Sequence, residues 1–312
     1  MRSHHRITAL LIVATCLATL AACTSASDIP ERPDDELAEP EVPDEPVPSA
    51  FETYRDEAEA AFELRSDRES AQEAIEMWQR ALDDESAEKE SDSTIASVFE
   101  DLARAYYFVA RYHAADGPVP DRDGAQWAER GEDAAIEALR LRAPDFHDAI
   151  IRGAPFEAEL PDISAEAVDA VLWYAKNITL LANTGGVSRA VASKPILDSI
   201  METVLQYDPG AHYGAAHRFF GVRWIDRSFH RDPDASRDSF EAAADLAPEF
   251  VLTYVLEARY LAIHQDDRDR FEALLTKAIS TVDDADSEPS PENRIVRSWA
   301  QALLDQADEY FD

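Results

Sequence analysis

Apolar residues recur at intervals of three and four along most of this chain, which is the spacing of one face of an amphipathic helix. The pattern predicts an all-α protein, because the sequence has no convincing run of alternating β-branched residues that would favour strands. Residues 145–162 are expected to be irregular, with at most a short helix. The segments with helical spacing are 51–64, 95–113, 125–141, 164–182, 196–206, 213–224 and 290–311, and shorter ones around Trp78, Phe240, Tyr254 and Phe271.

The stretch from Asp208 to Phe250 is typical of two antiparallel helices closed by a proline turn. Tyr213 begins the apolar stripe of the first helix, and Ser236 begins that of the second. Large apolar side chains and small residues that let helix backbones approach are expected to hold this pair together. These residues are Phe220, Gly221, Trp224, Phe240 and Ala243.

Three prolines share one register, since apolar or small residues lie eight and five positions before Pro144, Pro209 and Pro248. The interval from Pro144 to Pro209 corresponds to nearly two periods of the roughly 34-residue tetratricopeptide (TPR) repeat. The interval from Pro209 to Pro248 corresponds to one period with an insertion at 226–234. The sequence therefore predicts a domain over 50–312 of TPR-like helix pairs, forming a right-handed α-solenoid of about 11–12 helices.

Three serines have the surroundings of helix starts. Ser66 to Glu69 matches a capping box, in which the serine oxygen and the glutamate each accept from the other's backbone N–H. Ser164 precedes another periodic segment, which the Gly185-Gly186 pair is expected to close. Ser290 followed by Pro291 is expected to begin the terminal helix.

The N-terminus has the features of a signal peptide. Basic residues precede an apolar core over 7–20, and Leu20-Ala21-Ala22-Cys23 resembles a bacterial lipoprotein cleavage site. Residues 1–22 would be removed, and Cys23 would be lipidated and would be the one cysteine of the mature chain. The alternatives are an ordinary secretory peptide cut near Ala22 and a transmembrane anchor, for which the apolar run is short.

Residues 23–49 are predicted to be the lipidated cysteine and an acidic, proline-rich tether that stays extended. Thr24 stands where an inner-membrane retention signal would usually place aspartate, so we expect the outer membrane, facing the periplasm. The chain has a formal net charge of −35, which argues against nucleic acid and anionic lipid headgroups as partners. A salt-adapted or high-GC source accounts for this charge more simply than an acidic recognition surface.

The order of several short segments resembles the T-component (TatT) family of tripartite ATP-independent periplasmic (TRAP) transporters, over about 135–311. The segments are Ala138-Leu139 with Pro144, Trp173-Tyr174-Ala175, 197–209, 213–221, Phe240-Glu241-Ala242-Ala243 with Ala247-Pro248, 271–275, and Pro291-Glu292-Asn293 with 302–304. The resemblance implies a helical-repeat lipoprotein that associates with the periplasmic solute-binding (P) component and binds a hydrophobic ligand in its concavity. The long tether and the 226–234 insertion depart from the family.

Catalytic and metal-binding motifs do not occur in the sequence. It contains no glycine-rich phosphate loop, no HExxH and no nucleophile motif with a partnered histidine, so we predict neither enzyme activity nor a cofactor. His212 and His217 lack further ligands at helical spacing, so no metal site is predicted. The segments 119–124 and 283–288 both depart from the calcium-loop pattern. The first is interpreted as a solvated turn and the second as an acidic linker.

A ligand or partner groove is the remaining candidate site. Aromatic and polar residues outside the main apolar stripe could line the inner surface of the repeats: Trp173, Tyr174, Tyr213, His217 and Arg218. The leading hypothesis is a non-enzymatic partner of a TRAP solute-binding protein. A carrier of a lipid or other hydrophobe and a general TPR scaffold for envelope assembly are the alternatives, and a homo-oligomer is compatible with each.

Overall fold

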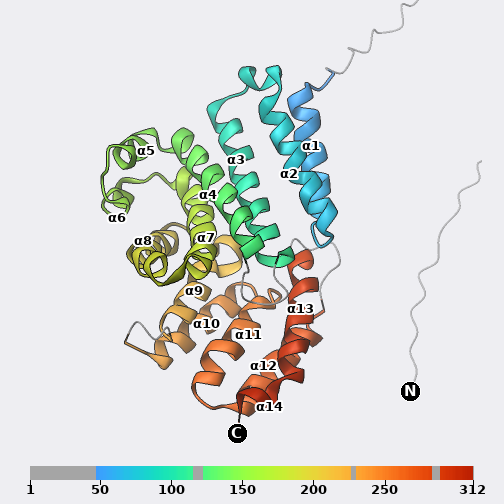
Figure 1. Cartoon of the computed structure of the whole chain (residues 1–312), viewed down its shortest axis with the longest axis vertical. Coiled ribbons are helices and arrows are strands. Elements are labelled where there is room, and N and C mark those ends of the chain that lie inside the picture. The colour runs from blue at the N-terminus through green and yellow to red at the C-terminus, as the bar shows by residue number, and fades with distance from the viewer. Residues whose placement is uncertain (1–46, 115–121, 226–229, 283–288, 312) are drawn as a thin grey trace, which may run out of the picture. The chain divides into compact units, whose positions relative to one another are not determined.

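The computed structural model describes residues 47–114, 122–225, 230–282 and 289–311. Within these ranges the protein is built from helices without strands, which confirms the predicted all-α fold (Figure 1). Several predicted features lie outside the described residues: the signal peptide, Cys23, most of the tether, the acidic segment 283–288 and residues 119–121 of the segment 119–124. The right-handed solenoid stays a prediction.

The described α-helices follow the expected order. They outnumber the predicted 11–12 because several of them are short. They are α1 (Ala50–Glu63), α2 (Arg68–Asp83), α3 (Asp92–Phe108), α4 (Arg122–Arg142), α5 (Pro144–Ile151), α6 (Phe156–Glu159), α7 (Val168–Thr184), α8 (Gly186–Tyr207), α9 (Ala211–Arg223), α10 (Pro233–Leu246), α11 (Leu252–Leu256), α12 (Arg268–Ser280), α13 (Ser290–Asp305) and α14 (Ala307–Tyr310). Successive long helices pack as antiparallel neighbours: α1 with α2, α3 with α4, α7 with α8, and α9 with α10. Among the described helices, none is long and apolar enough to cross a membrane.

Several helix starts differ from the predictions. Ser164 does not cap the helix that follows it, because its side chain forms no capping hydrogen bond and α7 begins at Val168. The capping box at Ser66 is wrong, because Asp67 caps α2 and its carboxylate accepts from the backbone N–H of Ser70 at 3.0 Å. A full capping box instead begins α1, where Ser49 and Glu52 accept from each other's backbone N–H. Ser66 and Glu69 are the residue types of a capping box, but Asp67, which is itself a preferred N-cap residue, caps α2.

Helix α8 begins ten residues earlier than predicted, at Gly186, and only Gly185 separates it from α7. Pro195 lies inside it and is exposed to solvent. Because proline has no backbone N–H, one carbonyl of the preceding turn has no partner within the helix. Water can hydrate that carbonyl here, which lowers the usual free-energy cost of a proline inside a helix. The terminal helix is also interrupted, because α13 ends at Asp305 and a short α14 follows.

The segment 208–250 forms the predicted helix pair, with one turn that the periodicity did not reveal. His212, Tyr213 and Gly214 adopt left-handed backbone conformations with φ of 43°, 62° and 77°, so the helical run that carries the stripe starts after them. Tyr213 is therefore not part of the stripe. Gly214 suits this turn, because only glycine adopts such a conformation without steric cost.

Three of the five residues predicted to hold this pair do so. Phe240 and Ala243 have no exposed surface. A Cβ on Gly221 would lie 2.8 Å from the Phe240 ring, so the close approach of α9 and α10 requires glycine. Phe220 and Trp224 are only half-buried, which corrects their assignment to the core.

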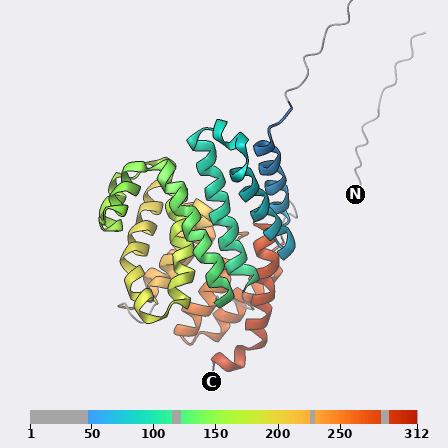
Figure 2. The ribbon, with the colours of Figure 1, turned by 45° about the horizontal axis from the view of Figure 1, so that its top comes forward.

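The last long helix returns to the first helix pair. Arg65, in the turn after α1, donates two hydrogen bonds to the Glu292 carboxylate on α13, at 2.9 and 3.2 Å, and both side chains are at most 3% exposed. Beside this pair, the Tyr112 and Trp299 rings stack at 5.5 Å. Figures 1 and 2 show α13 next to the α1–α2 turn. Helices from the two ends of the domain thus share one core.

Candidate functional site

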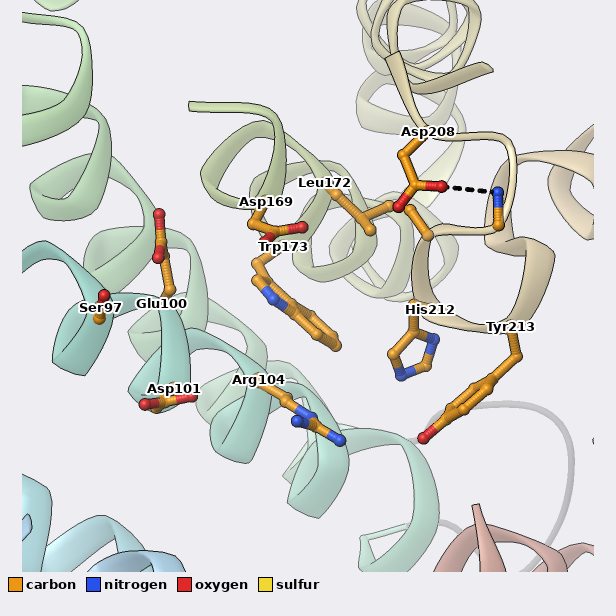
Figure 3. Close-up of a pocket in the computed structure, with 12 residues that line it drawn as sticks. Ser97, Glu100, Asp101, Arg104, Asp169, Leu172, Trp173, Asp208, His212 and Tyr213 are labelled. Atoms are coloured by element: carbon orange, nitrogen blue, oxygen red, sulfur yellow. Dashed lines mark hydrogen bonds between the residues drawn. The ribbon is translucent and has the colours of Figure 1, made fainter. Parts of the chain in front are cut away.

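A cavity of about 470 Å³ opens between α3, α7 and the turn that begins α9; we call it the α3–α7–α9 pocket (Figure 3). Helix α3 contributes side chains one turn apart, and α7 contributes side chains three and four residues apart. Both helices therefore present a single face to the cavity. The lining residues are Ser97, Glu100, Asp101, Arg104, Asp169, Leu172, Trp173, Asp208, Gly210, Ala211, His212 and Tyr213.

Four carboxyl groups line the pocket, and two of them are engaged. Glu100 accepts two hydrogen bonds from the Arg142 guanidinium at 3.0 and 2.9 Å. Asp208 accepts from the backbone N–H of Gly210 at 2.9 Å. These contacts leave Asp101 and Asp169 as the carboxyl groups available to the cavity.

Asp101 and Asp169 form no hydrogen bond and no ion pair with any residue in the described ranges. Burial raises the pKa of Asp101 to about 7, and the neighbouring carboxylates of Glu59 and Glu100 add to this effect, while Arg104 opposes it. Burial, followed by the Asp208 carboxylate, also raises the pKa of Asp169. Arg142 and Arg104 oppose the rise at Asp169, so nearby guanidinium groups partly stabilise the ionised form of each carboxyl.

The pocket is also lined by the rings of Trp173, His212 and Tyr213. The Trp173 ring meets the His212 ring edge-on at 4.9 Å, and the Tyr213 ring stacks on Phe250 at 4.6 Å. The Arg104 guanidinium lies 6.0 Å from the centre of the Trp173 ring. A ligand in the pocket would therefore contact flat apolar surfaces beside charged groups.

Arg218 holds the left-handed turn that brings His212 and Tyr213 to the pocket. Its guanidinium donates to the carbonyl of His212 at 2.7 Å and to the carbonyl of Tyr213, and it lies 4.4 Å from the centre of the Phe250 ring. Arg218 is buried, and burial lowers its pKa to about 10. Because the turn has positive φ, these bonds offset the conformational strain of two residues that carry Cβ atoms.

Behind the pocket, basic side chains gather in the interior. We call this group, formed by Arg65, Arg104, Arg111, Lys176 and Arg218, the basic centre. The Lys176 ammonium donates to His212 Nδ1 at 2.9 Å and lies 4.4 Å from the centre of the Tyr107 ring. Burial lowers the pKa of both Lys176 and His212, and the neighbouring arginines lower it further.

The Asp101 carboxyl predicts a pH dependence of stability. Its pKa is about 7 in the folded protein and near 3.9 in an unfolded chain, so folding opposes ionisation and stability falls as the pH rises from about 4 to 7. We expect Asp101→Asn to be more stable than the wild type by about 2 kcal/mol near pH 8. This is less than the full pKa difference implies, since water reaches the pocket mouth.

Urea unfolding at about pH 4.5 and about pH 8 measures this effect, and the advantage of Asp101→Asn should shrink at the lower pH. Asp92→Asn is the matched control, because Asp92 is exposed on the same helix. An advantage of the same size at both pH values would show that the pKa of Asp101 is not raised by folding.

The structure places the five predicted groove residues in three locations. Trp173 and Tyr213 line the pocket, and Arg218 lies behind it as the support of the turn. Tyr174 instead stacks on the Phe156 ring at 4.9 Å, away from the pocket. His217 is half-buried and does not line the cavity.

Sequence reasoning missed Asp101, Asp169 and Arg104. Asp101 and Arg104 lie one turn apart on a predicted helix, and Asp169 precedes Trp173 by four residues. That spacing indicates that these residues share one helix face. Acidic residues occur on nearly every helix of this chain, however, so the spacing does not distinguish these residues from the others. In the described ranges, no group of three or more histidine, cysteine or carboxylate side chains is arranged to hold a metal ion.

Together, the fold and the site define an all-α protein of packed helix pairs with a small charged and aromatic pocket. Comparison with protein-family models identifies it further: the model of the TRAP transporter T-component matches residues 73–311. The chain belongs to this family. The match starts within α2, well before the part of the sequence that carries the resemblance. No curated protein matches the chain.

Proposed function

We propose that this chain is a non-enzymatic, lipid-anchored subunit that associates with the solute-binding (P) component of a TRAP transporter on the periplasmic face of the outer membrane. The family match over residues 73–311 carries the proposal, because it spans helices α3 to α13 and so includes the pocket. The acidic, proline-rich segment after Cys23 supports a tethered position, from which the domain could reach a receptor away from the lipid surface.

The proposal is tested by mixing the mature chain with the solute-binding protein encoded beside it and measuring association by calorimetry and chemical crosslinking. We expect a complex that survives moderate salt, since contact between specific surfaces is less sensitive to screening than attraction between net charges. A solute-binding protein from an unrelated transporter of similar net charge serves as the control. Absence of a complex with the neighbouring receptor, or equal binding of the control, would refute the proposal.

The pocket gives more support to a polar ligand than to the lipid-carrier alternative. Carboxyl groups, Arg104 and His212 make up much of its lining, whereas a site for a lipid chain is expected to be mostly apolar. We therefore propose that any ligand handled by this domain is small and polar. Native mass spectrometry of the purified chain checks this, and a co-purified lipid would contradict it.

A further inference from the structure

Three members of the basic centre are buried without a carboxylate to neutralise them. Arg111, Lys176 and Arg218 are at most 8% exposed, and none of the three forms an ion pair with another described residue. They contact a histidine, aromatic rings and backbone carbonyls instead. The Glu292 carboxylate, which is buried near them, accepts two hydrogen bonds from Arg65. The interior is therefore electropositive, although the chain has a net charge of −35.

Tyr107 lies among these three cations. The Arg111 guanidinium donates a hydrogen bond to the Tyr107 hydroxyl, and the Lys176 ammonium lies 4.4 Å from the centre of the Tyr107 ring. Burial raises the pKa of Tyr107, and the charges of Arg111 and Arg218 oppose that rise. Burial lowers the pKa of Lys176, and the charge of Arg218 lowers it further. The three cations are thus close enough to repel one another in a medium that screens charge poorly.

Beside these cations, two hydrogen-bond donors have no acceptor within the described ranges. They are Arg111 Nη1 and the Tyr112 hydroxyl, and both atoms are buried. Both residues lie on a π-helical turn, Val109–His113, a conformation that is frequent at functional sites. Both also contact Trp299, because the Tyr112 ring stacks on it at 5.5 Å and the Arg111 guanidinium lies 4.7 Å from its centre. Burial raises the pKa of Tyr112 well above its ordinary value, so the hydroxyl keeps the proton that it can donate.

We propose that the basic centre binds one small anion of single negative charge. The anion accepts hydrogen bonds from Arg111 Nη1 and the Tyr112 hydroxyl, and the charges of Lys176 and Arg218 stabilise it. A halide ion and the carboxylate group of a small organic acid share this chemistry. Phosphate and sulfate fit less well, because their additional oxygens need more donors than these two. His212 contacts Lys176 at 2.9 Å and also lines the α3–α7–α9 pocket, so the site lies next to that pocket.

Thermal unfolding of the full mature chain in detergent tests the proposal. Sodium gluconate, whose anion is too large for an enclosed site, is replaced by sodium chloride or by sodium acetate at constant ionic strength and pH. We expect the unfolding midpoint to rise with at least one of the two anions. Because such an anion binds the folded state, the unfolding constant should fall about tenfold for each tenfold rise in anion above its dissociation constant. A rise with chloride alone assigns the site to a halide, and a rise with acetate assigns it to a carboxylate group. No rise with either anion would overturn the proposal.

Tyr112→Phe removes the unpaired hydroxyl and keeps the ring that stacks on Trp299. This variant should raise the dissociation constant of the anion about tenfold, since a hydrogen bond to a charged group contributes on that scale. In gluconate it should be no less stable than the wild type, because the hydroxyl has no partner among the described residues. An anion effect as large as that of the wild type would refute the assignment.

Tyr260→Phe is the matched control, because Tyr260 is a half-buried tyrosine on a second π-helical turn, Glu257–Ala262. It should leave the anion effect unchanged. Arg111→Gln should abolish the effect, since it removes Nη1 and the charge together, and circular dichroism in gluconate checks its fold. Where chloride raises the midpoint, crystals grown with bromide should show an anomalous peak beside Arg111 and Tyr112. Bromide found only elsewhere would overturn the proposal. None of these measurements depends on the receptor, so the proposed function is tested separately.

Discussion

Replacing Glu292 by glutamine should lower the free energy of unfolding by about 3–5 kcal/mol, the usual cost of removing one partner from a buried ion pair. Arg65 would keep its charge in a site where both side chains are at most 3% exposed. It would also remain within the basic centre, close to the Arg104 and Arg218 guanidinium groups. The variant is therefore expected to be the most destabilised of those considered, as measured by urea unfolding.

Glu272→Gln is the matched control for this effect. Glu272 pairs with Arg268 at 2.7 Å, but their side chains are 42% and 46% exposed, so its loss should cost less than about 1 kcal/mol. If the two glutamine variants were equally stable, the pair between Arg65 and Glu292 would not hold the ends of the domain together. A further double variant, Arg65→Met with Glu292→Leu, should recover much of the loss, because it leaves no unpaired charge.

Replacing Cys23 by serine should move the protein almost entirely from the membrane fraction to the soluble periplasmic fraction. The proposed anchor consists of several acyl chains on one residue, and multiple chains give stable membrane attachment where a single chain does not. Membrane fractionation and intact-mass measurement of the mature N-terminus check the result.

Cys16→Ser is the control, because Cys16 is the other cysteine of the chain and lies within the segment predicted to be removed. This variant should fractionate and lipidate as the wild type does. A Cys23→Ser protein that stayed in the membrane fraction, with residues 1–22 still present, would instead indicate an uncleaved apolar anchor.

Helix positions were predictable because apolar residues still recur at intervals of three and four in this strongly acidic sequence. Phe240, Ala243 and Gly221 were correctly assigned, since a proline register and a small residue within a stripe report directly on helix contact. The left-handed turn at His212 and Tyr213 was not predicted. Positive φ is uncommon for a bulky residue such as tyrosine, and the turn depends on bonds that Arg218 donates from the following helix.

The pocket was predictable only through its aromatic residues. Trp173 and Tyr213 stand out in sequence because large rings are few, whereas Asp101 and Asp169 are two of many acidic residues. Their distinction is that both line the same pocket after folding, which depends on the packing of α3 against α7. The spacing of residues along the sequence does not predict which carboxylates will line a pocket in the folded protein.

The contact between Arg65 and Glu292 joins positions 227 residues apart. In an open repeat array each unit touches only its neighbours, so the end units can fray and refold by themselves. Here the first helix pair cannot complete its core until the last long helix has left the ribosome and returned to it. The domain should therefore fold late in synthesis and unfold as one cooperative unit, with no stable half left behind when either end is cut away.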